Sequence, residues 1–195
     1  WSTACTRKAT TSVCMVTTAA SSWLYISGEN GNDYLLGDRG NDILYGDIGS
    51  DSLVGESGND SLHGGDGNDE LYGNDDNDIL NGGAGRDIID GGNGNDTFYS
   101  SAGLDLNFGG DGNDVLFFNS GSDVEVFDGG TGDSDSIVMS YLSCNIDSWL
   151  HLTSGNYSMG SDGLTLNMSQ DSSGYIELSD GSLLAFSNIE HIILH

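Results

Sequence analysis

Aspartate recurs every nine residues through the middle of the chain, and this spacing is the feature best suited to chemistry. Counted in units of nine from Gly28, the sixth position is aspartate in all eleven units from residue 28 to 126. Carboxylates are hard oxygen ligands that suit calcium. Zinc and copper favour histidine and cysteine, and neither residue occurs at the sixth position. The spacing therefore predicts a series of oxygen-lined cation sites.

The other positions of the unit predict the structure that holds these carboxylates. Glycine dominates positions one, two and four, as in GGDGNDELY (64–72), and indicates turns with positive φ, where Asp38, Asn74 and Asp76 are acceptable substitutes. Positions seven to nine alternate like a short strand. Position eight is the inward one, and it reads Leu35, Leu44, Leu53, Leu62, Leu71, Leu80, Ile89, Phe98 and Leu116.

Two units then make one coil, with a strand on each side of a thin aliphatic core. The predicted fold is all-β, a right-handed parallel β-roll in which no unit can bury enough surface alone. Stacking places aspartates 18 residues apart on one edge, so Asp33, Asp51 and Asp69 form one ladder. A dication between successive turns would convert repulsion between these carboxylates into attraction.

The units GGDGNDELY, GGNGNDTFY and GGDGNDVLF resemble the nonapeptide of the RTX, or hemolysin-type, calcium-binding repeat family. This resemblance implies a parallel β-roll, several Ca²⁺ ions, export by a one-step (type I) bacterial system and folding outside the cell. It assigns calcium binding to the position-six carboxylates of Asp33, Asp42, Asp51, Asp60, Asp69, Asp78, Asp87, Asp96 and Asp114. It also assigns the position-four carbonyls of Gly31, Gly40, Gly49, Gly58, Gly67, Gly85, Gly94 and Gly112. Asp105 and Asp123 lie in degraded units and are left out of this set.

The remainder of the chain divides around the predicted roll. Residues 1–22 read as a leader or linker, 23–137 as the roll and 138–195 as a β-rich C-terminal cap. WLYIS (23–27) is expected to be the first strand, with Trp23 over the open end, and FNSGSDVEV (118–126) is taken as the last unit before a two-residue slip. Asp-Gly pairs at 162–163 and 180–181 predict two hairpins. Cys5 and Cys14 either pair as a disulfide or stay as thiols.

Composition limits the classes of partner. The chain has 31 acidic and four basic residues and a net charge of −27, so nucleic acid and anionic lipid are poor partners. It contains no apolar run of the length that a membrane span needs, and its first residue, Trp1, indicates a piece of a longer protein.

The residues point to no catalytic group, so an enzyme is not expected. His191 and His195 fit a terminal strand better than a zinc site. Outward Tyr45, Tyr72, Tyr99, Phe108 and Phe117 suggest either an aromatic patch for a surface or carbohydrate partner or plain strand propensity.

The leading function is a calcium-binding module of a secreted bacterial adhesin or toxin. The alternatives are the C-terminal roll of an exported protease or lipase, with its active site upstream, and an ice-binding roll. The position-five asparagines would favour ice binding, but position three lacks a threonine row.

Overall fold

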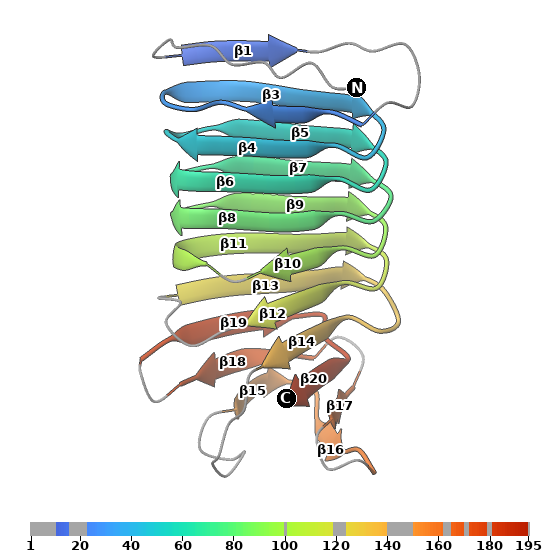
Figure 1. The fold of residues 1–195 in the computed structure, drawn as a ribbon. Helices are drawn as coiled ribbons and strands as arrows, with labels where there is room; N and C mark the ends of the chain where they lie inside the picture. Colours follow the sequence, from blue (N-terminus) through green and yellow to red (C-terminus); the bar gives the residue numbers. More distant parts are fainter. Residues whose placement is uncertain are drawn as a thin grey trace.

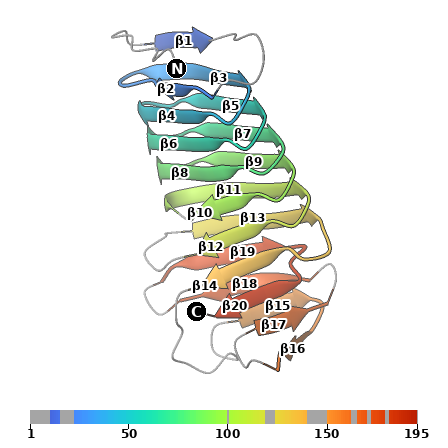
Figure 2. The ribbon, with the colours of Figure 1, turned by 45° about the vertical axis from the view of Figure 1, so that its right-hand side comes forward.

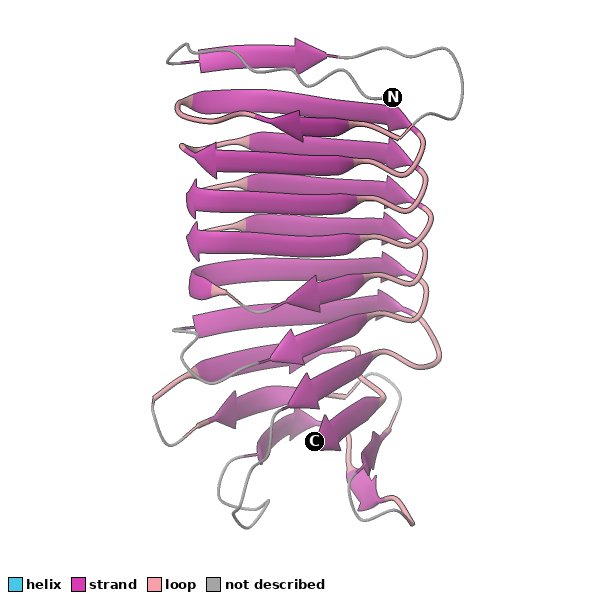
Figure 3. Cartoon of the chain, viewed as in Figure 1, coloured by secondary structure: helices cyan, strands magenta, loops and turns pink. Residues whose placement is uncertain are grey.

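Every regular element that the structure describes is a β-strand (Figure 3). The structure is a computed structural model, and it describes residues 11–15, 23–99, 101–118, 124–139, 150–161, 165–169, 172–178 and 181–194. The strands stack as successive coils along one axis (Figure 1). The predicted parallel β-roll is confirmed.

Two parallel sheets form the roll, because alternate strands along the chain pair with each other. Sheet A contains β1 (Thr11–Met15), β3 (Asn32–Arg39), β5 (Ser52–Ser57), β7 (Glu70–Asp75), β9 (Ile88–Asn93), β11 (Ala102–Asp111), β13 (Val124–Thr131) and β19 (Leu183–Ser187). Sheet B contains β2 (Tyr25–Ser27), β4 (Ile43–Ile48), β6 (Ser61–Gly67), β8 (Ile79–Gly85), β10 (Thr97–Tyr99), β12 (Val115–Phe118), β14 (Ser136–Met139) and β20 (His191–Leu194). The start of β11 also pairs with β8, which joins the two sheets.

The core is the predicted single row of position-eight side chains. Leu35 pairs with Leu53 and Leu53 with Leu71 in sheet A, while Leu44 pairs with Leu62 in sheet B. All nine predicted members of the row are 1% exposed or less. Burying one such side chain contributes about 1.5–3 kcal/mol, so a single coil cannot hold itself together and neighbours must stack.

A strand precedes the segment predicted to be the first strand. WLYIS is not the first strand, because β1 precedes it and pairs in parallel with β3, opposite Asn32 to Leu36. Ile26 of β2 does occupy the inward position, fully buried, in register with Leu44. Trp23 is 55% exposed and therefore faces solvent. Cys5 lies outside the described residues.

The register changes at a different place from the one predicted. β13 pairs with β11 so that Glu125 stands opposite Asp105 and Phe127 opposite Asn107. The two extra residues therefore come before Val124, and the predicted unit 118–126 is wrong. Phe127 is fully buried, with its ring 5.5 Å from that of Phe98, so burial of this aromatic side chain explains the observed register. Asp123 lies outside the described residues.

The C-terminal end adds one more coil and two hairpins. β19 pairs in parallel with β13, and β20 pairs in parallel with β14, so residues 183–194 continue both sheets (Figure 2). β15 (Leu150–Ser154) and β18 (Ser173–Glu177) extend sheet A in antiparallel pairing, as β16 (Tyr157–Met159) and β17 (Thr165–Met168) extend sheet B. Both predicted hairpins are present as β16–β17 and β18–β19. The division into a roll and a cap stays a prediction.

Candidate metal centre in the turns

Positions one to six of each unit carry the chain from one sheet to the other, and the strands continue into the first half of this turn, as β4 does to Ile48. Position two has positive φ in every unit from residue 28 to 99, with or without glycine, for example 74° at Asp38, 79° at Asn74 and 112° at Gly65. Position four is glycine with φ between 123° and 154° in most units, and Asp76 substitutes at 78°. Position-one glycines have no positive φ in this structure, so their predicted conformational role is wrong.

The position-six aspartates of the described turns are buried, and each one from Asp51 to Asp114 forms a hydrogen bond to the neighbouring coil. Its Oδ1 accepts the backbone N–H of the aspartate 18 residues earlier, so the Asp33 N–H donates to Asp51 at 2.6 Å and the Asp51 N–H to Asp69 at 2.8 Å. The other edge repeats the pattern, as in Asp60 N–H to Asp78 at 2.7 Å. All nine predicted aspartates are 4% exposed or less. The two predicted ladders therefore exist, and they run through the interior of the turns.

The second carboxylate oxygen lacks a partner in most of these turns. Oδ2 is buried without a hydrogen bond in Asp42, Asp51, Asp60, Asp69, Asp78, Asp87, Asp96 and Asp114. Buried polar atoms are nearly always satisfied in native proteins, and a buried unpaired charge is costly. A whole row of such atoms indicates that a cation belongs beside them.

Burial raises the pKa of these carboxyl groups. Desolvation is the largest cause, and neighbouring carboxylates raise the values further while the backbone hydrogen bond opposes the rise. The pKa reaches about 7 at Asp60, Asp69 and Asp114 and about 8 at Asp78. It reaches about 6 at Asp51, Asp87 and Asp96, and the pKa of Asp42 is also raised. Without a cation, burial thus makes the charged forms less favourable than those of an exposed aspartate.

Position-one glycine leaves space beside two oxygens in most of the described turns. A Cβ on Gly46 would lie 2.5 Å from both Asp51 Oδ2 and the carbonyl oxygen of Gly64, the position-one residue of the next coil. At Gly28 the corresponding distances, to Asp33 Oδ2 and Gly46 O, are 2.7 and 2.8 Å. We call this pair of oxygens the cradle. Sequence reasoning missed its carbonyl, because glycine at position one suggested turn conformation rather than space.

Position-four glycines are required for close stacking of the turns. A Cβ at Gly49, Gly58 or Gly67 would collide with the carbonyl oxygen of the position-four glycine one coil earlier. These carbonyls therefore lie against the next turn. Their assignment as calcium ligands stays a prediction.

The donor set fits calcium. Among the described residues, no three His, Cys, Asp or Glu side chains come together as a metal group. A cation in these turns would therefore draw on backbone carbonyls as well as carboxylates. Calcium accepts six to eight oxygens in flexible geometry, whereas magnesium demands octahedral spacing.

Comparison with protein families agrees with this donor set. The model of the RTX calcium-binding nonapeptide repeat matches four times, over residues 25–53, 45–80, 72–106 and 108–125. The chain belongs to the RTX calcium-binding repeat family. It is therefore a calcium-binding repeat module with sites for several Ca²⁺ ions. A search of curated proteins found no match.

Asparagine at position five forms a second ladder in these RTX repeats. Its Oδ1 accepts the backbone N–H of the position-five residue 18 residues later, as from Asn59 to Asn41 at 3.2 Å and from Asn95 to Asn77 at 2.6 Å. The direction is opposite to that of the aspartate ladder, so each coil both donates backbone N–H groups to side-chain oxygens of its neighbours and accepts such bonds from them. Because these Oδ1 atoms are engaged within the roll, the asparagine row offers little to ice.

Asp105 belongs to the ladder although its unit is degraded. Its Oδ1 accepts the Asp87 N–H at 3.0 Å, and its Oδ2 accepts the Ser101 hydroxyl at 3.0 Å. Ser101 thus supplies a partner that is lacking in the eight turns with an unpartnered Oδ2. On the next coil Glu125 takes the aspartate position, 2% exposed, with Oε1 accepting from Asn107 Nδ2 at 3.0 Å. Burial, and then the charge of Asp105, raise the pKa of Glu125 to about 8.

The predicted aromatic residues do not form one patch. Consecutive repeats alternate between sheets, so Tyr72 and Phe108 lie in sheet A and the others in sheet B. Tyr45 stacks on His63 with centroids 4.7 Å apart, and Tyr99 stacks on Phe117 at 5.2 Å. His195 lies outside the described residues. The described part of the chain contains no helix that could cross a membrane.

Proposed function

We propose that this module folds when it binds calcium outside the cell and serves as a structural part of a secreted bacterial adhesin or toxin. The observation that carries the proposal is the row of buried Oδ2 atoms without partners, on aspartates whose pKa burial raises. In calcium-poor cytosol, a chain of net charge −27 would gain more by hydrating these carboxylates than by stacking them.

Calcium reverses this balance because binding and folding are then one event. Extracellular calcium modules bind with dissociation constants of roughly 10⁻⁴ to 10⁻³ M. At a calcium concentration about tenfold above that constant, each site adds about 1.4 kcal/mol to folding stability. Several sites acting together would exceed the repulsion within the ladders, and a structural role follows without any catalytic group.

Circular dichroism during a calcium titration, reversed by EGTA, tests the proposal. We expect a transition from coil to sheet in the range of extracellular calcium. Replacing Asp69 and Asp87 by Asn should move the midpoint to higher calcium, because both are 1% exposed ladder members. The matched control is Asp66→Asn, which removes one exposed carboxylate from the turn that ends at Asp69. Equal order after exhaustive chelation, with no bound ions by mass spectrometry, would refute the proposal.

A further inference from the structure

One more turn reproduces the cradle outside the residues that match the family. The match ends at residue 125, whereas this turn runs from Gly129 to Asp135. Asp135 is fully buried, and its Oδ1 accepts the Asp114 N–H at 2.7 Å, so it continues the ladder from Asp114. Its Oδ2 is buried without a hydrogen-bond partner.

The second oxygen of this cradle comes from a distant part of the sequence. A Cβ on Gly129 would lie 2.9 Å from Asp135 Oδ2 and would collide with the carbonyl oxygen of Asn188. Asn188 therefore stands where the next coil's position-one glycine stands in the repeats. Its side chain is anchored to the same coil, because Nδ2 donates to Asp128 Oδ1 at 2.7 Å.

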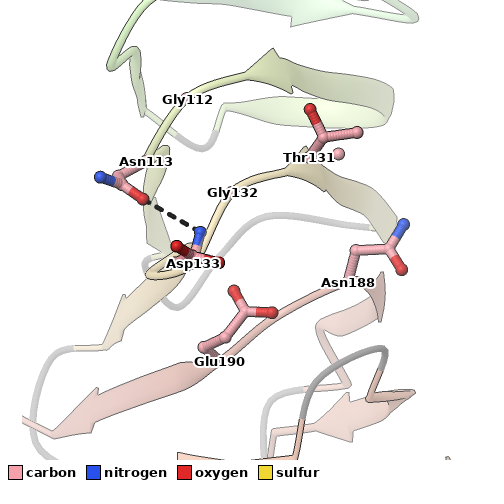
Figure 4. Close-up of a pocket in the computed structure, with 8 residues that line it drawn as sticks. Gly112, Asn113, Thr131, Gly132, Asp133, Asn188 and Glu190 are labelled. Carbon is pink, nitrogen blue, oxygen red and sulfur yellow. Dashed lines mark hydrogen bonds between the residues drawn. The ribbon is translucent and has the colours of Figure 1, made fainter.

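Glu190 takes the place of the next coil's aspartate. Its Oε2 accepts the Asp135 N–H at 2.9 Å, which is the bond that a ladder aspartate makes in the repeats. Figure 4 shows the Glu190 side chain pointing from its own segment toward the turn that carries Gly132 and Asp133. Gly132, Asp133, Asn188 and Glu190 line one cavity at this place.

We propose that this turn is a further calcium site, held by the carboxylates of Asp135 and Glu190 and the carbonyl oxygen of Asn188. The inference rests on the proposed function, because it extends the same chemistry to a turn in which the aspartate lies one residue past its nonapeptide position. All three donors are oxygens, which suits calcium.

The ion would fasten the last coil to the roll. Asp135 precedes Asn188 by 53 residues, so one ion would join two distant segments of the chain. β19 and β20 lie on either side of Asn188 and Glu190, and they form the final pairs of the two parallel stacks. Calcium would therefore order residues 183–194 in addition to the repeats.

Bound calcium and hydrogen exchange in the full chain test this site. At saturating calcium, Glu190→Gln should bind one ion fewer per chain than the unsubstituted protein, by mass spectrometry after equilibrium dialysis. Amide protection should fall in residues 183–194 and stay unchanged in residues 28–114. The matched control is Glu177→Gln, an exposed glutamate of β18 that should change neither reading. Gly129→Ala, which fills the cradle, should reproduce the loss.

The outcomes separate this inference from the proposed function. An unsubstituted chain that binds no calcium would refute both. A chain that folds with calcium, but whose Glu190→Gln and Gly129→Ala variants keep every ion and full protection of residues 183–194, would overturn the further site alone. Loss of protection throughout residues 28–114 in both variants would also overturn it, since the site is assigned to the last coil only.

Discussion

Replacing Gly46 by Ala tests the cradle directly. Gly46 has no positive φ, so alanine can adopt its backbone conformation, and a stiffer unfolded chain would by itself favour folding by about 0.4–1 kcal/mol. The added Cβ, however, would lie 2.5 Å from both Asp51 Oδ2 and Gly64 O. Carbon cannot approach oxygen that closely, so the turn must shift or the site must lose its ion.

The expected net effect of Gly46→Ala is destabilisation of roughly 1.5–4 kcal/mol. Overpacking typically costs about 1–3 kcal/mol. Losing one site costs about 1.4 kcal/mol more at a calcium concentration tenfold above the dissociation constant, and the stiffer unfolded chain offsets part of the total. Denaturant unfolding in calcium, followed by circular dichroism, measures this change. Bound calcium should fall by one ion per chain.

The control for this variant lies in the same turn. Ile48 stands at position three and is 55% exposed, and another unit carries Ala84 at that position. Ile48→Ala should therefore change stability by less than about 0.5 kcal/mol and leave the calcium count intact. If Gly46→Ala matched this control in both stability and bound ions, the space beside position-one glycine would not be where calcium binds.

Three further predictions concern pH, the core and the degraded unit. Because folded-state pKa values are raised, to about 6 at Asp51 and about 8 at Asp78, the metal-free roll should be most stable below about pH 4 and lose stability as pH rises to 8. Acidification in EGTA should thus increase sheet content by circular dichroism, and no increase would contradict the desolvation argument. Leu71→Ala should cost about 2–5 kcal/mol in calcium, because Leu71 is fully buried, whereas Tyr72→Ala on the outer face of the same strand should cost less than half as much. Ser101→Ala should cost about 1–3 kcal/mol, because it removes the hydrogen-bond partner of Asp105 Oδ2. The control is Ser52→Ala on the outer face of the roll. Equal unfolding midpoints for the two variants would argue against the Ser101 bond.

The nonapeptide period was sufficient to predict the roll, its ladders and its core. Leu35 and Leu53 are 18 residues apart, and only a coil of two units places them in register. The period failed where the backbone departs from it. FNSGSDVEV keeps an aspartate at the apparent sixth position, yet the pairing selects Glu125 and buries Phe127. A one-dimensional pattern does not contain that competition between side chains.

The nonapeptide period did not predict the last coil, because the sequence departs from the period there. Between Asn188, at the position-one place, and Glu190, at the aspartate place, only Ile189 intervenes, so most of the six-residue turn is absent. Carbonyls at position four were assigned from the sequence, but the position-one carbonyls of the cradle were missed. Glycine at position one was interpreted as a turn residue, because glycine has several structural uses and the sequence does not show which one applies.

Because units alternate between two sheets, the number of units sets both the length of the roll and the side on which the chain leaves it. Inserting 18 residues would add a full coil, lengthening the rod by about 4.8 Å and leaving whatever follows facing the same way. Inserting nine would add half a coil and turn everything downstream to the opposite side. A gene that gains or loses such units can therefore tune both the reach and the facing of an attached domain without altering any single turn.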